Sequence, residues 1–387
     1  MADDKRFLPY GQQVIDEDDI AAVVSALRSP LITQGPRIAE FEAALAAYTS
    51  APHATVVANG TIALQLAYAA LGLEAGDEII TTPNTFAATA NAARALGAEV
   101  RFCDVEPDTG NMDVASVEAL VTPRTRGIVP VHFGGLPVDL AAVHTLAQRH
   151  HLWIVEDAAH ALGATYRDQP VGACRFSDAT TFSFHPVKHL TTGEGGAITV
   201  RDPALKRHID RLRHHGIERE HFSQPSPGPW YHEVVSLGWN GRLTDIQAAL
   251  GISQLRKQPS WLARRRELAA VYRQRLAELG PHVTLQATRP ERESAFHLLP
   301  ALIDFDALGS TRAHVMNALR ARNIGTQVHY IPVDSQPYYR GRYGDPPAHP
   351  GMASFYAREL SLPMFASLDA DDVTRVVREL ASVLGAT

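Results

Sequence analysis

Short runs of β-branched and other apolar residues alternate with helix-like segments between residues 55 and 200, and this alternation restricts the possible folds most strongly. Apolar runs of this length, separated by helices, are typical of parallel βα units with both faces of the sheet covered. The sequence therefore predicts an α/β domain built on a mostly parallel sheet. The expected strands are residues 55–58, 78–82, 99–103, 127–131, 152–156, 179–184 and 196–200, and the expected helices are 62–71, 86–96 and 138–150.

The pattern changes after about residue 245. Two segments of strongly helical composition come first, and strand-like runs mixed with helices follow them, which predicts a smaller α+β unit. We expect a large domain over residues 1–245, with an N-terminal segment 1–35, and a small C-terminal domain over residues 246–387. In this second part we expect helices at 246–255, 262–279, 311–322 and 369–384, and strands at 283–286, 296–303 and 325–331. Residues rich in Pro and Gly at 224–228 and 337–350 predict loops.

Charge and cysteine content argue against several classes of protein. The formal net charge is −6, so the chain offers no basic field for nucleic acid. Cys103 and Cys174 lie far apart without ligand-type spacing, which argues against a disulfide framework or a zinc site and suits a reducing cytoplasm. The start of the sequence is polar and acidic, unlike a signal peptide, and polar residues interrupt the uncharged stretch 54–73. We expect a cytoplasmic protein without a membrane span or a metal site.

Ligands of open α/β sheets bind outside the carboxyl ends of the strands, so polar residues directly after predicted strands are the first site candidates. Gly60 and Thr61 lie between a strand and a helix, where free backbone N–H groups and the helix dipole favour a phosphate. Asp157 follows an apolar strand, where its carboxylate can hold a cation or a protonated ring nitrogen. Taken alone, each is more often an ordinary turn or cap residue.

Lys188 follows a predicted strand, beside Ser183, among apolar residues and glycines. Partial desolvation there would lower the pKa of the lysine and make its amine available to a carbonyl. Phe86, at the start of a predicted helix, offers a ring that can lie against a flat cofactor. Taken alone, such a lysine is usually a solvated surface charge and such a phenylalanine a core residue.

The four candidates indicate a site more strongly together than alone, because they occur in one chain and in this order. A phosphate turn, a stacking ring, a strand-end carboxylate and a lysine beside a serine are the parts needed to hold pyridoxal 5′-phosphate (PLP). They supply a phosphate cradle, a platform for the ring, a counter-ion for the pyridine nitrogen and an amine for the aldehyde. The sequence therefore predicts a PLP site.

Longer blocks carry a family resemblance, and they are residues 156–163, 181–196 and 237–250, with further matches at 7–11, 31–36 and 328–332. Through them the chain resembles the DegT-type sugar aminotransferases among the fold-type I PLP enzymes, over nearly its whole length. The phrases Phe-His-Pro-Val-Lys188 and Pro-Asn-Thr-Phe-Ala-Ala-Thr-Ala-Asn91 look closest to the branch that makes UDP-4-amino-4,6-dideoxy-N-acetyl-β-L-altrosamine. Gly241 and Asp334 depart from that branch, which leaves the sugar specificity open.

The resemblance implies how the cofactor is held. Lys188 would form the Schiff base with PLP, and Asp157 would pair with the pyridinium nitrogen. The Gly60 backbone, Thr61 and Ser183 would bind the phosphate.

The resemblance also implies roles for three further residues. His160 would lie near the 3-hydroxyl of the ring, and Phe86 would stack on the ring. Asn240 would reach the cofactor phosphate of the neighbouring subunit, which implies a homodimer with two shared sites. His185 is left out of the chemistry, because it can equally be a packed histidine before Pro186.

The implied reaction moves an amino group from L-glutamate to a nucleotide-linked keto-sugar, at C4 of a UDP-linked 4-keto-6-deoxy-hexose. Two alternatives stay open. A PLP-dependent sugar dehydratase branch is similar, but it carries His where this chain has Lys188. A protein that binds PLP or a nucleotide sugar without turnover is the other alternative, and such a protein needs no reactive amine.

Overall fold

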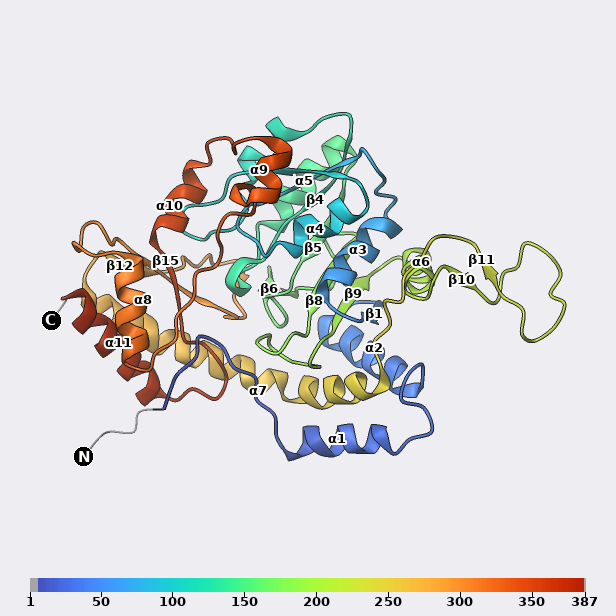
Figure 1. Ribbon diagram of the computed structural model, residues 1–387, viewed down its shortest axis with the longest axis horizontal. Coiled ribbons are helices and arrows are strands. Elements are labelled where there is room, and N and C mark those ends of the chain that lie inside the picture. The colour runs from blue at the N-terminus through green and yellow to red at the C-terminus, as the bar shows by residue number, and fades with distance from the viewer. Residues whose placement is uncertain (1–5, 386–387) are drawn as a thin grey trace.

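A seven-stranded sheet forms the centre of the computed structural model, which describes residues 6–385 (Figure 1). Strand β9 runs antiparallel to both of its neighbours, and the other neighbouring strands are parallel. The order across the sheet is β1 (His53–Val57), β9 (Gly196–Val200), β8 (Ala179–Ser183), β5 (Trp153–Asp157), β4 (Thr125–Val129), β2 (Glu78–Thr81) and β3 (Glu99–Phe102). The prediction of a mostly parallel α/β sheet is therefore confirmed.

Neighbouring residues of each strand pack into different cores, because successive side chains of a strand point to opposite faces. In β5, Val155 packs in the core that contains α3, α4 and α6, whereas Ile154 packs in a core with α5. Helices α3 (Gly60–Ala70), α4 (Ala88–Ala95) and α6 (Pro203–Arg213) cover one face, and α2 (Pro36–Thr49), α5 (Leu140–His150) and α7 (Asp245–Leu276) cover the other. It follows that Glu156 and Asp157 face opposite sides of the sheet.

A smaller antiparallel sheet lies beside the large one (Figure 1). Its strands are β12 (Val283–Leu285), β14 (Leu299–Ile303) and β15 (Glu359–Leu362), and they share a core with α8 (Arg312–Ala321) and α11 (Ala370–Leu384). Helix α7 packs against α1 (Glu17–Leu27) and α2 and also against β12 and α11. The expected domain boundary between residues 245 and 246 falls at the start of α7, and it stays a prediction.

Several short elements complete the chain. The hairpin of β10 (Ile217–Glu218) and β11 (Glu233–Val234) projects from the body of the molecule, and the predicted loop 224–228 lies within it (Figure 1). Strands β6 (Thr165–Tyr166), β7 (Gln169–Pro170) and β13 (Arg292–Glu293) form a third small sheet. The 3-10 turns are η1 (Val114–Ser116), η2 (Glu118–Leu120), η3 (Phe133–Gly135), η4 (Ala277–Leu279) and η5 (Val333–Ser335).

Three predictions for the second half of the chain are wrong in detail. The predicted helices 246–255 and 262–279 are one helix, α7, which continues through Pro259 because neighbouring helices pack along it. The predicted loop 337–350 contains α9 (Pro337–Tyr343) and begins α10 (Pro350–Arg358). Each of these helices starts with a proline, whose fixed φ suits the first helical position.

The predicted strand 325–331 is an irregular segment instead. Gln327 forms an isolated antiparallel bridge with Ser361 of β15. Beyond it the backbone bonds side chains: the N–H of His329 donates to Glu359 Oε2 at 2.9 Å, and the N–H of Tyr330 donates to Asn84 Oδ1 at 3.2 Å. Because these donors bond side chains, they cannot join a strand ladder.

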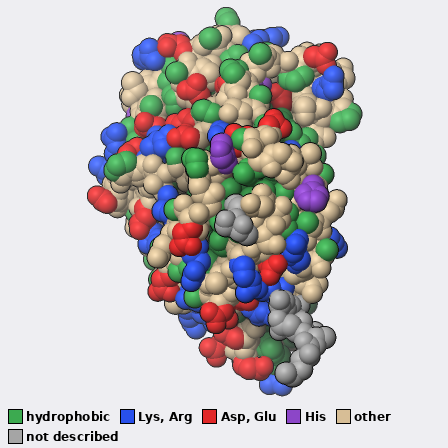
Figure 2. Space-filling model, turned by 90° about the vertical axis from the view of Figure 1, so that its left-hand side faces the viewer, with side chains coloured by type: hydrophobic (Ala, Val, Ile, Leu, Met, Phe, Trp, Pro, Cys, Tyr) green, Lys and Arg blue, Asp and Glu red, His purple; other side chains and the backbone are tan. Residues whose placement is uncertain are grey.

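Basic and acidic side chains are interspersed over the face at the left of Figure 1, as Figure 2 shows. This face therefore presents no extended field of one sign.

Candidate active site

The predicted site residues meet in one large cavity of about 1300 Å³. It opens at the carboxyl ends of the central strands, as expected for an open α/β sheet. Seven of the eight predicted residues line it, namely Gly60, Thr61, Phe86, Asp157, His160, Ser183 and Lys188. The irregular segment that includes His329 and Tyr330 also lines it, together with His297, so residues from both parts of the chain contribute.

The turn between β1 and α3 allows close approach to the end of β8. A Cβ added at Gly60 would lie 3.0 Å from the Cβ of Ser183, which is tighter than ordinary contact. Asn59 Oδ1 accepts a hydrogen bond from the N–H of Ile62 at 2.9 Å and so caps the helix. The N–H groups at the first positions of α3 have no partner within the helix, so they can receive the oxygens of a phosphate, with Thr61 exposed beside them.

Asp157 is a buried carboxylate, only 6% exposed, that pairs with no cation among the described residues. Its Oδ2 accepts a hydrogen bond from Thr89 Oγ1 at 2.6 Å, and its Oδ1 accepts one from the N–H of Ala159 at 3.2 Å. Thr85 Oγ1 lies 2.6 Å from Thr89 Oγ1 and donates to it, since the Thr89 proton is directed to Asp157. A buried carboxylate held in this way suits a protonated ring nitrogen in the cavity.

Lys188 differs from the other lysines that the structure describes. Lys206 and Lys257 each pair with carboxylates, whereas Lys188 forms no ion pair with a described residue. Burial lowers the pKa of Lys188 to about 8, and the charge of Asp157 opposes this shift. A substantial fraction of the amine is therefore neutral near pH 8, the form that attacks a carbonyl.

His160 is buried beside Lys188, and its two ring nitrogens differ. Nε2 lies 3.1 Å from the hydroxyl of Tyr330, whereas Nδ1 is buried without a hydrogen-bond partner among the described residues. Burial, and after it the charge of Lys188, holds the pKa of His160 well below its usual range, so the ring is neutral. An unpartnered buried nitrogen of this kind can take a polar group of a bound molecule.

Phe86 and Asn240 are both exposed, but they lie in different places. The Phe86 side chain is 64% exposed and lines the cavity, 6.3 Å from the ring of Tyr330, so it is not a core residue. Asn240 lies outside the cavity, in a bridge to His214. His185 is exposed and does line the cavity.

The two positions that depart from the resembling branch also lie outside the cavity lining. A Cβ at Gly241 would come within 2.9 Å of Ile62 on α3, so a larger residue does not fit without movement. Asp334 is buried, with His349 Nε2 3.3 Å from its carboxylate.

Several residues of the cavity or its immediate support were not predicted as site residues, among them Thr89, His297, His329 and Tyr330. Thr89 could have been predicted from the sequence, because it lies four residues after Thr85 at the start of a predicted helix. The other three lie in the segments 296–303 and 325–331, which the sequence predicts as strands without placing them at the site. Only the fold brings them to the cavity.

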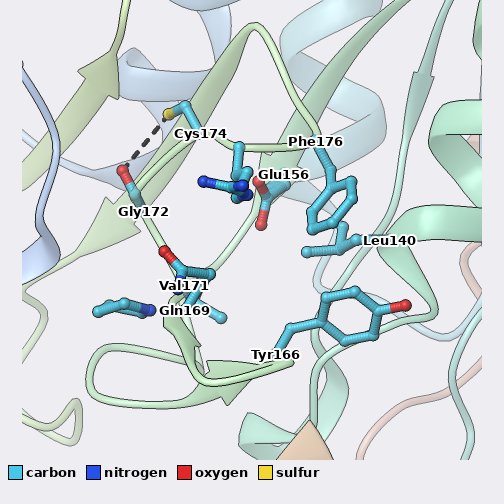
Figure 3. A pocket seen from close by; sticks show the side chains of 10 residues that line it. Leu140, Glu156, Tyr166, Gln169, Val171, Gly172, Cys174 and Phe176 are labelled. Carbon is cyan, nitrogen blue, oxygen red and sulfur yellow. Dashed lines mark hydrogen bonds between the residues drawn. The ribbon is translucent and has the colours of Figure 1, made fainter. Parts of the chain in front are cut away.

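Glu156, next to Asp157 in sequence, points into a second, much smaller cavity on the opposite face (Figure 3). This cavity of about 10 Å³ has room for no more than a water molecule. Glu156 is 2% exposed, and its carboxylate lies 2.8 Å from His132 Nε2 and accepts a hydrogen bond from Thr180 at 3.1 Å. These contacts fix the end of β5 on the face opposite the large cavity, and so they keep the side chain of Asp157 directed into that cavity.

The described residues contain no group of three His, Cys, Asp or Glu side chains that could hold a metal ion. Cys103 and Cys174 are both free and buried, and Cys174 Sγ donates to the carbonyl of Gly172 at 3.4 Å (Figure 3). Within residues 6–385, no helix is both long and apolar enough to cross a membrane.

Four independent features of the cavity fit PLP. They are the close backbone approach at Gly60, the carboxylate of Asp157 without a cation, the unpaired amine of Lys188 and the unpartnered nitrogen of His160. PLP offers a phosphate, a ring nitrogen, an aldehyde and a ring hydroxyl, one for each of these features.

The sequence model of the DegT/DnrJ/EryC1/StrS aminotransferase family matches residues 13–381. The spore coat polysaccharide biosynthesis protein SpsC of Bacillus subtilis is 39% identical over 381 residues, which are 98% of this chain and 97% of SpsC. PseC of Helicobacter pylori, an aminotransferase involved in the biosynthesis of pseudoaminic acid, superposes with a TM-score of 0.91 at 33% identity, over 99% of this chain and 100% of PseC. The PLP form of Spr1654 of Streptococcus pneumoniae superposes with a TM-score of 0.90 at 29% identity, over 98% of this chain and 99% of Spr1654.

Proposed function

Since the chain belongs to the DegT/DnrJ/EryC1/StrS aminotransferase family and is a PLP-dependent sugar aminotransferase, we propose that it moves an amino group from L-glutamate to a UDP-linked 4-keto-6-deoxy-hexose, at C4. The similarity to PseC over the whole chain supports this choice of acceptor. The observation that carries the reaction is the unpaired Lys188 in the same cavity as the cation-free carboxylate of Asp157.

The proposed roles of the residues follow from their positions. PLP, when bound, supplies an electron sink that stabilises negative charge at the carbon next to nitrogen. Asp157 holds the proton on the ring nitrogen through its charge, and Thr89 fixes the direction of that carboxylate. The Gly60 backbone, Thr61 and Ser183 bind the phosphate at the start of α3.

The remaining cavity residues act around the ring. Phe86 lies against the ring and His160 Nδ1 lies toward its hydroxyl in this proposal. Lys188 Nζ takes the proton from Cα of glutamate in the first half-reaction and delivers a proton to C4 of the sugar in the second. The lowered pKa of Lys188 suits both steps, because an amine with a pKa near 8 is ready to accept and to return a proton at neutral pH.

We also propose a homodimer in which Asn240 completes the site of the partner subunit. Asn240 is exposed and does not line the cavity of its own chain, and other residues of its segment expose apolar side chains. Leu237 is 83% exposed and Trp230 70% exposed, and α1 exposes Ile20 and Leu27. Exposed apolar residues of this size are typical of surfaces that a partner covers.

The test measures each half-reaction separately. With PLP and no sugar, the purified protein should exchange label between glutamate and 2-oxoglutarate, and with a UDP-linked 4-keto-6-deoxy-hexose it should form the 4-amino sugar, seen by mass spectrometry. Lys188→Ala should lose both activities, and Lys206→Ala, which removes a lysine that pairs with Asp210, should keep them. Exchange without amination of the keto-sugar would overturn the acceptor, and full activity in Lys188→Ala would overturn the mechanism.

A further inference from the structure

His329 belongs to a closed set of hydrogen bonds behind the wall of the large cavity. Its Nδ1 lies 2.8 Å from Ser361 Oγ, and Ser361 Oγ lies 2.6 Å from Glu359 Oε1. The backbone N–H of His329 donates to Glu359 Oε2 at 2.9 Å. Glu359 and Ser361 are alternate residues of β15, so both side chains reach the same side of that strand.

The Nε2 atom of the same ring faces the cavity. His329 lines the cavity, Nε2 bonds no described residue, and this atom is not among the buried polar atoms that lack a partner. The nitrogen is therefore open to a bound molecule. Whether it donates or accepts a hydrogen bond depends on the tautomer, which the opposite nitrogen sets.

Two proton arrangements fit the set, and they differ by one proton. With Glu359 ionised, Ser361 donates to Glu359 and accepts from Nδ1–H, which leaves Nε2 as an acceptor. With Glu359 protonated, Glu359 donates to Ser361, Ser361 donates to Nδ1, and Nε2 carries the hydrogen. One proton taken up at Nε2 converts the first arrangement into the second, because the Nδ1 proton moves to Ser361 and the Ser361 proton moves to Glu359.

Burial decides between the two arrangements. It raises the pKa of Glu359 to about 8, against the opposing effects of Ser361, the His329 N–H and Arg312. Arg312 Nη1 bonds the backbone carbonyl of Glu359 at 3.2 Å. Burial, and after it the charge of Lys188, lowers the pKa of His329 to about 3, so this ring is neutral in both arrangements.

The nearby phenols do not supply the proton. Burial raises the pKa of Tyr10 and of Tyr330, so both stay neutral when Glu359 titrates. Below about pH 8, Glu359 is therefore protonated and Nε2 of His329 is a donor.

We propose that Glu359 and Ser361 are positioning residues that hold His329 as an Nε2–H donor in the cavity, where it binds a carboxylate of the amino-acid donor. The cationic side chains of the cavity lining are Arg94 and Lys188. Arg94 already pairs with Glu99 at 2.8 Å, and Lys188 takes part in the reaction. A fixed neutral N–H group in the cavity is a complementary partner for an anionic oxygen. This inference rests on the proposed function in needing an amino-acid donor.

The kinetic test uses glutamate/2-oxoglutarate exchange, which needs no sugar. In Glu359→Gln the amide N–H donates to Ser361 at every pH and so keeps the donor tautomer. From pH 7 to 9.5, the KM for glutamate should rise about tenfold in the wild type and stay level in Glu359→Gln, with kcat changed less than about twofold. Because Lys188 is present in both proteins, its titration cancels in the comparison.

Ser361→Ala breaks the set and should raise the KM for glutamate about tenfold already at pH 7. Ser260→Ala, an exposed serine on α7 that bonds only Lys257, is the matched control and should behave as the wild type. Equal KM profiles for the wild type and Glu359→Gln would overturn the proposal. Loss of exchange in the wild type itself would instead overturn the proposed amino donor.

A second measurement does not depend on turnover. Nitrogen-15 NMR of the PLP-loaded protein with labelled histidine reports the tautomer, and His329→Gln assigns the signal. The wild type should carry the proton on Nε2 at pH 7 and on Nδ1 at pH 9.5, whereas Glu359→Gln should keep it on Nε2 throughout. A proton on Nδ1 at pH 7 in the wild type would overturn the proposed hydrogen-bond arrangement of His329, Ser361 and Glu359, whatever the activity shows.

Discussion

Thr89 Oγ1 donates a hydrogen bond to Asp157 Oδ2 across 2.6 Å, and so joins the first turn of α4 to the end of β5. The two residues are 68 positions apart in sequence. The bond orients a buried carboxylate that no cation holds among the described residues. In the proposed mechanism that carboxylate keeps the cofactor ring protonated, so its direction matters as much as its charge.

Replacement of Thr89 by Val should therefore weaken PLP binding. The change keeps the shape of the side chain but removes a hydrogen bond to a charged group, which contributes about 1.5–3 kcal/mol. We expect the Kd for PLP to rise roughly tenfold or more, measured by titration of the apoprotein with absorbance detection. Thr145→Val, which removes an exposed hydroxyl on α5, is the control. A Kd unchanged in Thr89→Val would show that the bond does not support the cofactor.

Cofactor loading should depend on pH through Lys188. Its neutral amine attacks the aldehyde, and its pKa is about 8 because burial disfavours the charge. The rate of PLP incorporation into the apoprotein should therefore increase with pH and level off above about pH 8. Asp157→Asn should move the midpoint to lower pH, since the charge of Asp157 raises the pKa of Lys188. A midpoint near the ordinary lysine value of about 10.4 would contradict the desolvated position of the amine.

Gly60 should tolerate no side chain when PLP is bound. A Cβ there would already lie 3.0 Å from Ser183 Cβ, at the place proposed for the phosphate. Gly60→Ala should raise the Kd for PLP about tenfold, with a smaller effect on the stability of the apoprotein, because alanine suits a helix better than glycine. Gly341→Ala, where a Cβ meets nothing within 4 Å, is the matched control and should bind PLP normally.

The strand-end half of the cavity could be predicted from the sequence, and the opposite wall could not. Apolar strands followed by polar residues place Thr61, Asp157 and Lys188 at one edge of a parallel sheet by topology alone. His329 and Tyr330 reach the cavity from an irregular segment, whose backbone is fixed by Glu359 and Asn84 rather than by a ladder. The sequence predicts a strand over residues 325–331, and it gives no sign of the long-range side-chain bonds that replace the strand.

The segments that contain prolines were predicted wrongly in two opposite ways, and packing partners distant in sequence explain both. Pro337 and Pro350 suggested a loop, but each occupies the first position of a helix, where its missing N–H costs nothing. Pro259 lies inside α7, where the lost hydrogen bond is offset by packing against neighbouring helices. Local composition cannot separate these cases, because the packing partners are distant in sequence.

Mixed dimers should decide which subunit uses Asn240. In the proposed homodimer, each site combines Lys188 of one subunit with Asn240 of the other. Lys188→Ala and Asn240→Ala should each lower activity when alone, the first completely. When the two variants are mixed and allowed to exchange subunits, each mixed dimer should regain one intact site and so up to about half of the wild-type activity per dimer.

No such recovery of activity is expected if Asn240 completes the site of its own subunit. The only Lys188-containing site of a mixed dimer would then lack Asn240, and the activity per dimer would be about half that of Asn240→Ala. Light scattering on the same samples reports the assembly, since the exposed side chains of Leu237 and Trp230 predict a dimer rather than a monomer. A monomeric wild type with full activity would contradict the shared site, because Asn240 lies outside the cavity of its own chain.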